Sequence, residues 1–190
     1  ARMEEALGVL IRLFTETEPI SYESDWFTLK DAHLQVRPYQ LPHPPIAVSS
    51  IHSPAGVALA GKYGTSVLSM SIDQETDLSS QWSIAEESAA RHGQVVRRED
   101  WRLVMPVHVA ETRQQAMDDI RSIAGIYQRE YLERTLTLKE TSTPMDRIVE
   151  EMAESGSWIV GSPDDCIEMI RKLDERSGGF GGLLVQGIDW

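Results

Sequence analysis

The chain alternates short, continuous apolar runs with segments of helical periodicity, and this alternation limits the possible folds more than any other feature. The apolar runs lie at residues 46–51, 65–71, 101–110 and 183–185. They lack the polar alternation of a strand with one solvated face, which predicts parallel strands buried on both faces. Because parallel neighbours need a crossover connection, the helices between the runs are expected to cover a four-stranded sheet.

The first two crossover helices carry recognisable start and stop residues. Ser53 is a favoured N-cap residue, Pro54 is a favoured first helical residue, and Gly64 is expected to end that helix. A second helix is predicted from about Glu75, with Gly93 just past its end. Each predicted helix therefore fits between two apolar runs.

Capping residues also mark the later helices. Thr112 and Gln115 form a capping-box pattern that opens a long predicted helix. Its apolar face is expected to consist of Ala116, Ile120, Ile123, Tyr127 and Tyr131. A polar connector at residues 135–144 and a short helix at about 145–154 follow.

The end of the chain shows the pattern most clearly. In GSPDDCIEMIRKL, residues 161–173, Ser162 is expected to cap a helix whose buried stripe contains Ile167, Ile170 and Leu173. The glycines of GGFGG, residues 178–182, then precede the last strand. This position favours helix termination and close packing over a phosphate-binding loop.

Residues 1–45 depart from the alternation. A stripe at three- and four-residue steps predicts a helix there, formed by Met3, Ala6, Leu7, Leu10, Ile11 and Phe14. Residues 20–40 read as an extended excursion or hairpin, and LPHPP at residues 41–45 excludes a helix at that point.

Composition excludes several functional classes. The net charge of −12 argues against binding to nucleic acid, which needs a clustered basic face. No apolar run approaches the roughly 18 residues of a membrane span, so no membrane association is expected. The single cysteine, Cys166, excludes an internal disulfide and is interpreted as a packed core thiol in a cytoplasmic protein. The five histidines lack metal-ligand spacing, so no metal site is predicted.

Two α/β architectures are compatible with the strand and helix pattern. No G-x-G-x-x-G follows the first strand, which weakens a dinucleotide-binding doubly wound sheet. A (β/α)8 barrel typically takes about 250 residues, more than the 190 present. The pattern therefore favours half of such a barrel.

Three blocks carry a resemblance to a known family. They are WFTLKDAHLQVRPYQLPHPPIAV at residues 26–48, SSIHSPAGVALAGKYG at residues 49–64, and the GSPDDCIEMIRKL and GGFGGLLV segments of residues 161–185. In this order they resemble the luciferase-like flavin-dependent monooxygenases, and more narrowly their limonene monooxygenase-like branch. The resemblance implies a TIM-type barrel, with residues 1–190 as a single partial domain covering approximately strands 5 to 8. The first half of the barrel and its final helix would be absent.

The resemblance also implies a chemistry. Members use reduced FMN and O2 to oxygenate a small hydrophobic organic substrate such as a terpene, with a flavin reductase as electron donor. Catalytic residues would lie outside this chain, which alone would be incomplete and inactive, and would form a homo-oligomer or pair with the missing barrel half. Two alternatives stay open: a deazaflavin-dependent oxidoreductase of the same fold, and a non-catalytic half-barrel that associates with a partner subunit.

Site residues follow from the resemblance and from barrel geometry. The resemblance places the flavin phosphate after Ile51, and the start of a helix there is independently suited to an anion, which nominates Ser50, Ser53, Ala55 and Gly56 as cofactor-binding residues. The carboxyl ends of the next two strands nominate the substrate-binding residues Met70 and His108. Each has a structural alternative: Ser53 as a cap only, Met70 as core filler, and His108 as a hydrogen-bonded core imidazole. His52 could donate to the flavin, although an exposed loop histidine is the simpler interpretation.

Overall fold

The computed structural model describes residues 2–51, 53–70, 77–135 and 142–188. The chain forms two compact units, Ala1–Ile46 and Ala47–Trp190. Within the described residues, no helix combines the length and apolar character needed to cross a lipid bilayer.

The first unit contains one helix and one hairpin. Its elements are α1 (Arg2–Thr15), β1 (Ile20–Glu23) and β2 (Thr28–Ala32), and the two strands pair antiparallel. Glu5 of α1 accepts hydrogen bonds from the Tyr22 hydroxyl at 3.1 Å and from Trp26 Nε1 at 2.6 Å. The predicted hairpin is therefore confirmed, and these two bonds tie it to the helix.

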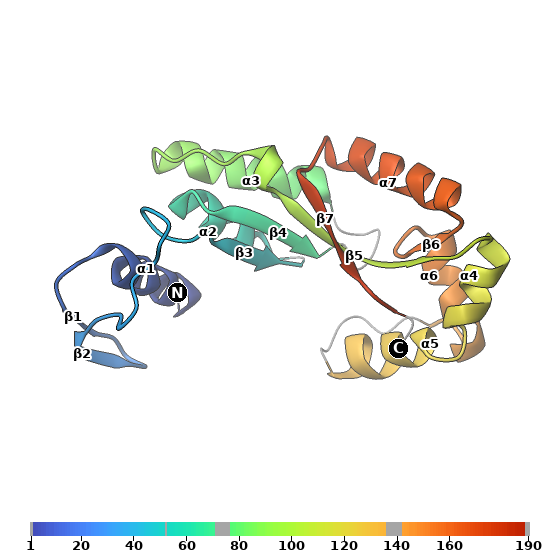
Figure 1. Cartoon of the computed structure of the whole chain (residues 1–190), viewed down its shortest axis with the longest axis horizontal. Coiled ribbons are helices and arrows are strands. Elements are labelled where there is room, and N and C mark those ends of the chain that lie inside the picture. Colours follow the sequence, from blue (N-terminus) through green and yellow to red (C-terminus); the bar gives the residue numbers. More distant parts are fainter. Residues whose placement is uncertain (1, 52, 71–76, 136–141, 189–190) are drawn as a thin grey trace. The chain divides into compact units, whose positions relative to one another are not determined.

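The second unit is built on a parallel sheet, as predicted (Figure 1). Its strands are β3 (Ala47–Ser50), β4 (Ser66–Met70), β5 (Arg102–Val109), β6 (Ile159–Gly161) and β7 (Gly182–Gln186). The order is β3-β4-β5-β6, with β7 also paired to β5. The four predicted strands are confirmed. The short strand β6 was not predicted because three residues are too few to show a periodicity.

Strand β5 has three partners. Its residues 102–104 pair with β4, residues 102–106 pair with β7, and residues 107–109 pair with β6. Pro106 lies in the short gap between the β4 and β6 partners and stands opposite Gln186 of β7. The proline is thus placed where neither β4 nor β6 pairs with β5.

The helices of the second unit follow the predicted order of crossovers. They are α2 (Pro54–Tyr63), α3 (Leu78–Arg91), η1 (Arg98–Asp100), α4 (Arg113–Ile120), α5 (Ala124–Ile126), η2 (Tyr127–Thr135), η3 (Met145–Arg147), α6 (Ile148–Glu154) and α7 (Pro163–Ser177). In Figure 1, α3 and α7 run along the same side of the sheet.

Two serine–proline pairs open helices in the same way. Ser53 Oγ accepts a bond from the Ala55 amide at 3.3 Å, and Ser162 Oγ accepts one from the Asp165 amide at 3.3 Å. Asp165 completes a capping box by accepting from the Ser162 amide at 2.9 Å. The hydroxyl and amide of Ser162 hold the pKa of the Asp165 carboxyl below its ordinary value. The predicted caps of α2 and α7 are thus confirmed.

The long helix predicted from residue 112 is interrupted. The Thr112 cap is present, but α4 ends at Ile120, a turn at residues 121–123 follows, and η2 has π-helical geometry. The turn and the wider π turn shift the helical phase, so the extrapolated apolar face was wrong at Ile123 and Tyr131, which are 42% and 46% exposed. On α7, Ile167 is likewise exposed, whereas Leu173 is buried.

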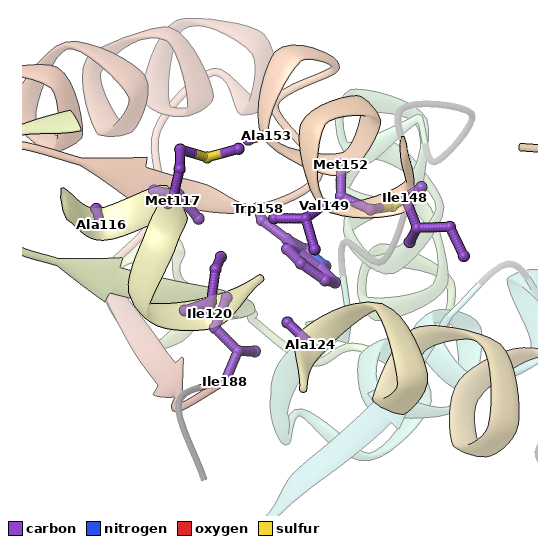
Figure 2. Close-up of a cluster of buried hydrophobic side chains, with 11 residues drawn as sticks. Ala116, Met117, Ile120, Ala124, Ile148, Val149, Met152, Ala153, Trp158 and Ile188 are labelled. Atoms are coloured by element: carbon purple, nitrogen blue, oxygen red, sulfur yellow. The ribbon is translucent and has the colours of Figure 1, made fainter. Parts of the chain in front are cut away.

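A buried cluster joins α4, α5 and α6 to β6 and the end of the chain (Figure 2). Its members are Ala116, Met117, Ile120, Ala124, Ile148, Val149, Met152, Ala153, Trp158, Val160 and Ile188. Ile188 lies two residues beyond β7, so the cluster fixes the end of β7 beside the α4–α5 segment.

Cys166 is the packed core thiol that the sequence predicted. Its side chain is buried on α7, and Sγ lies 3.7 Å from the Gly161 carbonyl oxygen. Burial raises the pKa of the thiol above its ordinary value, which keeps it protonated at neutral pH.

Burial alternates along β3 and β4, contrary to the expectation that both faces are covered. Val67 and Ser69 are buried under helices, whereas Leu68 and Met70 on the opposite face are only half-buried. On β5, Leu103 is buried while its neighbours are half-buried. Among the residues that the structure describes, one face of the sheet therefore stays open, with side chains that are only half-buried.

Helices α2 and α3 approach closely at Gly61. A Cβ at this position would overlap the carbonyl oxygen of Ala85 and lie 2.8 Å from the Cβ of Ser88. Beside this contact, Ser88 Oγ donates to the Ala58 carbonyl at 2.6 Å. The missing side chain thus sets the distance between the two helices.

We predict that Gly61→Ala lowers the free energy of unfolding of the complete gene product by about 2 kcal/mol, as expected for overpacking. The loss should appear although alanine favours a helix over glycine by about 1 kcal/mol. Urea unfolding of the variant measures the change. The control is Ser83→Ala on the exposed side of α3, and a Gly61→Ala variant as stable as that control would contradict the packing argument.

Candidate functional site

The loop after β3 leads directly into the exposed start of α2. Ser53, Pro54 and Ala55 are exposed, and the first turn of α2 carries no acidic side chain. Gly56 is buried, and a Cβ there would lie 2.7 Å from the Ser49 carbonyl oxygen. Glycine therefore lets the start of α2 lie against the end of β3.

The four predicted cofactor residues come together at this loop, in different roles. Ser50 is buried and its Oγ donates to the Ser53 carbonyl at 2.7 Å, so its hydroxyl shapes the loop. Gly56 supplies the close approach, while Ser53 and Ala55 present an exposed hydroxyl oxygen and backbone. His52 lies outside the described residues.

A chain of hydrogen bonds joins the loop after β3 to the neighbouring strands and helix. Trp101 Nε1 donates to Ser69 Oγ at 2.9 Å, and Ser69 Oγ donates to Gln81 Oε1 at 2.6 Å. Gln81 Nε2 in turn donates to the Ile51 carbonyl at 2.5 Å. Ser69 and Gln81 are buried, so the bonds between Trp101, Ser69 and Gln81 lie in a low-dielectric interior where such bonds are strong, while the bond to Ile51 is partly buried. The loop is therefore fixed to β4, α3 and the start of β5.

This geometry suits an anionic group. The first amides of a helix have no intrahelical acceptor, and the helix dipole favours negative charge at that end. In α2 the helix start is exposed at the carboxyl end of a parallel strand, although Pro54 has no N–H and the Ala55 amide donates to Ser53 Oγ. Parallel α/β folds bind ligands at that edge. The start of α2 can thus hold a group of phosphate type.

The two predicted substrate residues lie at different levels of the sheet. Met70, the last residue of β4, is half-buried on the open face and pairs with Val104. His108 is four residues farther along β5, a distance of about 13 Å along an extended strand. The structure does not bring these two side chains to one point.

His108 has a carboxylate partner that sequence reasoning missed. Its Nε2 lies 3.1 Å from Asp119 Oδ2 of α4, and the His108 side chain is only 12% exposed. The contact joins β5 to α4 across the turn between them, so no spacing in the local sequence predicts it. A carboxylate beside an imidazole orients the ring and selects its tautomer.

The end of β7 carries another missed contact. Gln186 Nε2 donates to the Tyr127 hydroxyl of η2 at 2.5 Å. Together with Ser50 and His108, Gln186 places polar groups at the carboxyl ends of three strands. Among the described residues, no group of three or more His, Cys, Asp or Glu side chains could hold a metal ion.

Comparison with known proteins gives a consistent result. The family model described as luciferase-like monooxygenase matches residues 1–179. The chain is 43% identical over 195 residues to 4-hydroxyprotoasukamycin monooxygenase of Streptomyces nodosus subsp. asukaensis, and 38% identical over 192 residues to limonene 1,2-monooxygenase of Rhodococcus erythropolis. These alignments cover all of this chain but only 53% and 49% of the two relatives. The chain therefore spans about half the length of the curated relatives it matches.

Solved structures show the same fold at lower identity. A monooxygenase from Streptomyces bottropensis superposes with a TM-score of 0.76 at 22% identity, covering 98% of this chain and 54% of that one. The oxygenating constituent of 3,6-diketocamphane monooxygenase from Pseudomonas putida, solved with FMN, gives 0.75 at 20% identity, covering 97% and 56%. An F420-dependent secondary alcohol dehydrogenase gives 0.68 at 20% identity, covering 96% and 54%. These likenesses confirm the predicted barrel-type fold.

We predict that Gln81→Ala lowers the free energy of unfolding of the complete gene product by about 1–3 kcal/mol, because the Ser69 hydroxyl and the Ile51 carbonyl lose their buried partner. Hydrogen exchange should also speed up in the loop after β3. Gln114→Ala on the exposed surface of α4 is the control and should change stability by less than about 0.5 kcal/mol. Unchanged exchange in the loop would show that Gln81 does not hold it.

Proposed function

This chain belongs to the luciferase-like monooxygenase family, and from that premise we propose that it is part of a flavin-dependent monooxygenase. The enzyme uses reduced FMN and O2 to oxygenate a small hydrophobic organic substrate, and a separate flavin reductase supplies the reduced cofactor. A terpene is one candidate substrate, since the Rhodococcus relative is named for limonene. The observation that carries the proposal is the exposed, acid-free start of α2 at the carboxyl end of β3.

The residues at the start of α2 fit a flavin phosphate. Ser53 and Ala55 are exposed there, and the small side chains leave room for a tetrahedral anion beside the backbone amides. The Gln81 bond to the Ile51 carbonyl keeps the loop in place before any ligand arrives. The flavin supplies the electrons and the reaction with O2, and the protein supplies binding and orientation.

The open sheet face fits the apolar part of such a site. Leu68, Met70 and Val104 are half-buried and lie on this face. Covered by further chain, they would exclude water from a flavin ring and from an apolar substrate. His108 is held by Asp119 at the end of β5, where it could bind a polar group of either ligand.

We further propose that residues 1–190 are a partial barrel domain that functions only when other strands complete it. Leu184 and Val185 of β7 are 47% and 64% exposed, although both are apolar and lie in a parallel strand. The missing strands come either from the same polypeptide or from a partner subunit. Association of this kind would bury the open face and the unpaired strand edges.

We predict that Ser53→Asp weakens FMN binding to the complete gene product about tenfold, equivalent to about 1.4 kcal/mol. Aspartate caps a helix as well as serine does, so the helix is kept while a negative charge is placed beside the phosphate. Titration of flavin fluorescence measures the affinity.

Two comparisons isolate the charge effect. Ser53→Asn is an equally good cap without the charge, and it should bind FMN more tightly than Ser53→Asp. Riboflavin, which lacks the phosphate, should bind both variants equally. Equal FMN affinities for the two variants would reject the phosphate site. If the protein bound the deazaflavin F420 more tightly than FMN, F420 would be assigned as the cofactor instead of FMN.

We predict that the 190-residue chain, expressed alone, does not behave as a stable monomer. Its open sheet face should drive association, which sedimentation velocity detects as concentration-dependent species, and should bind a hydrophobic dye. A monomer with a cooperative thermal transition and no dye binding would contradict the partial-barrel proposal.

A further inference from the structure

Tyrosines 127 and 131 form a stacked pair at the carboxyl end of β7. Their ring centroids are 5.2 Å apart with an interplanar angle of 25°. Tyr127 is half-buried, whereas Tyr131 is 46% exposed, so one face of the pair is open. Figure 1 shows the α5–η2 segment near the end of β7, and the bond from Gln186 to the Tyr127 hydroxyl makes the link direct.

The opposite side of η2 is anchored. Glu133 is fully buried and forms an ion pair with Arg129 at 2.9 Å, and it accepts from Gln128 Nε2 at 3.3 Å. Arg129 also donates to the Thr143 carbonyl at 2.5 Å. Leu132 of the same segment is buried as well. The η2 segment is therefore anchored through Arg129 and Glu133, while the Tyr131 side chain stays exposed.

The Tyr127 hydroxyl can still donate a hydrogen bond. Its oxygen accepts from Gln186, so the phenolic hydrogen remains as a donor. Burial, and then the neighbouring Tyr131, raise the pKa of Tyr127 above its ordinary value, which keeps that hydrogen in place at neutral pH. The exposed side chains of Ile123 and Ile126 extend the apolar surface of the same segment.

We propose that the Tyr127–Tyr131 pair is the aromatic wall of the substrate site, that Tyr127 donates a hydrogen bond to a substrate oxygen, and that Gln186 is the positioning residue that sets Tyr127. The favoured substrate class is a cyclic, unsaturated molecule bearing a carbonyl group. Its flat apolar part packs on Tyr131, and its carbonyl accepts from Tyr127. This inference rests on the proposed function, because it assumes an organic substrate at the carboxyl edge of the sheet.

A matched pair of probes tests the inference without any cofactor. Limonene and carvone share a carbon skeleton, and carvone adds a carbonyl oxygen. Binding of each to the flavin-free complete gene product is measured by calorimetry or ligand-observed NMR. We expect carvone to bind about fivefold more tightly than limonene, which matches one net hydrogen bond.

The variants separate the three roles. Tyr127→Phe should abolish the preference for carvone and leave limonene binding unchanged. Tyr131→Leu should weaken both probes about fivefold, as expected for loss of an aromatic contact. Gln186→Leu should reduce the carvone preference while limonene still binds. Tyr39→Leu, at a tyrosine that is 98% exposed, is the control and should change neither affinity.

Three results would overturn the proposal. The first is a carvone preference that survives Tyr127→Phe, and the second is the absence of any preference in the unaltered protein. The third is a Tyr131→Leu variant that changes the sedimentation coefficient but not probe affinity, which would make this face a contact between protein segments. Because the measurement omits flavin, a failure here would not affect the FMN titration of the Ser53 variants, which tests the proposed function separately.

Discussion

The second unit depends on β5 having hydrogen-bonded neighbours along its whole length. Its first five residues pair with β7, its first three also pair with β4, and its last three pair with β6. A buried strand must satisfy its backbone groups, and parallel partners can reach it only through crossover helices. The positions of α3, α4 and α7, and so of the strand ends that carry the candidate site, follow from this requirement.

Local signals were enough for the caps of α2 and α7 and for every strand except the three-residue β6, but not for contacts between distant residues. Ser53 and Ser162 predicted where α2 and α7 begin, because a capping side chain bonds to a backbone amide within three residues of itself. The Gln81 bond to Ile51 and the Gln186 bond to Tyr127 join residues 30 and 59 positions apart. Contacts between residues so far apart produce no recognisable spacing in the sequence. The break after Ile120 escaped for another reason, since an apolar periodicity can continue through a turn that changes its phase.

The open sheet face connects the sequence to the proposal. Apolar residues on both sides of a strand predict cover on both sides, yet β4 buries Val67 and Ser69 while Leu68 and Met70 stay half-exposed. Further barrel strands over this face would resolve the mismatch. They would also enclose the carboxyl ends of β3, β5 and β7, where Ser53, His108 and Gln186 present their polar groups.

Cys166 has a consequence for chemical durability. Reduced flavin and O2 release hydrogen peroxide when oxygen is not passed to a substrate, and peroxide attacks thiolates far faster than thiols. The one cysteine of the chain is 5% exposed, and burial raises its pKa, so it offers almost no thiolate to an oxidant. In the proposed flavin-dependent enzyme, packing against the Gly161 carbonyl would therefore protect this cysteine from peroxide that escapes the reaction.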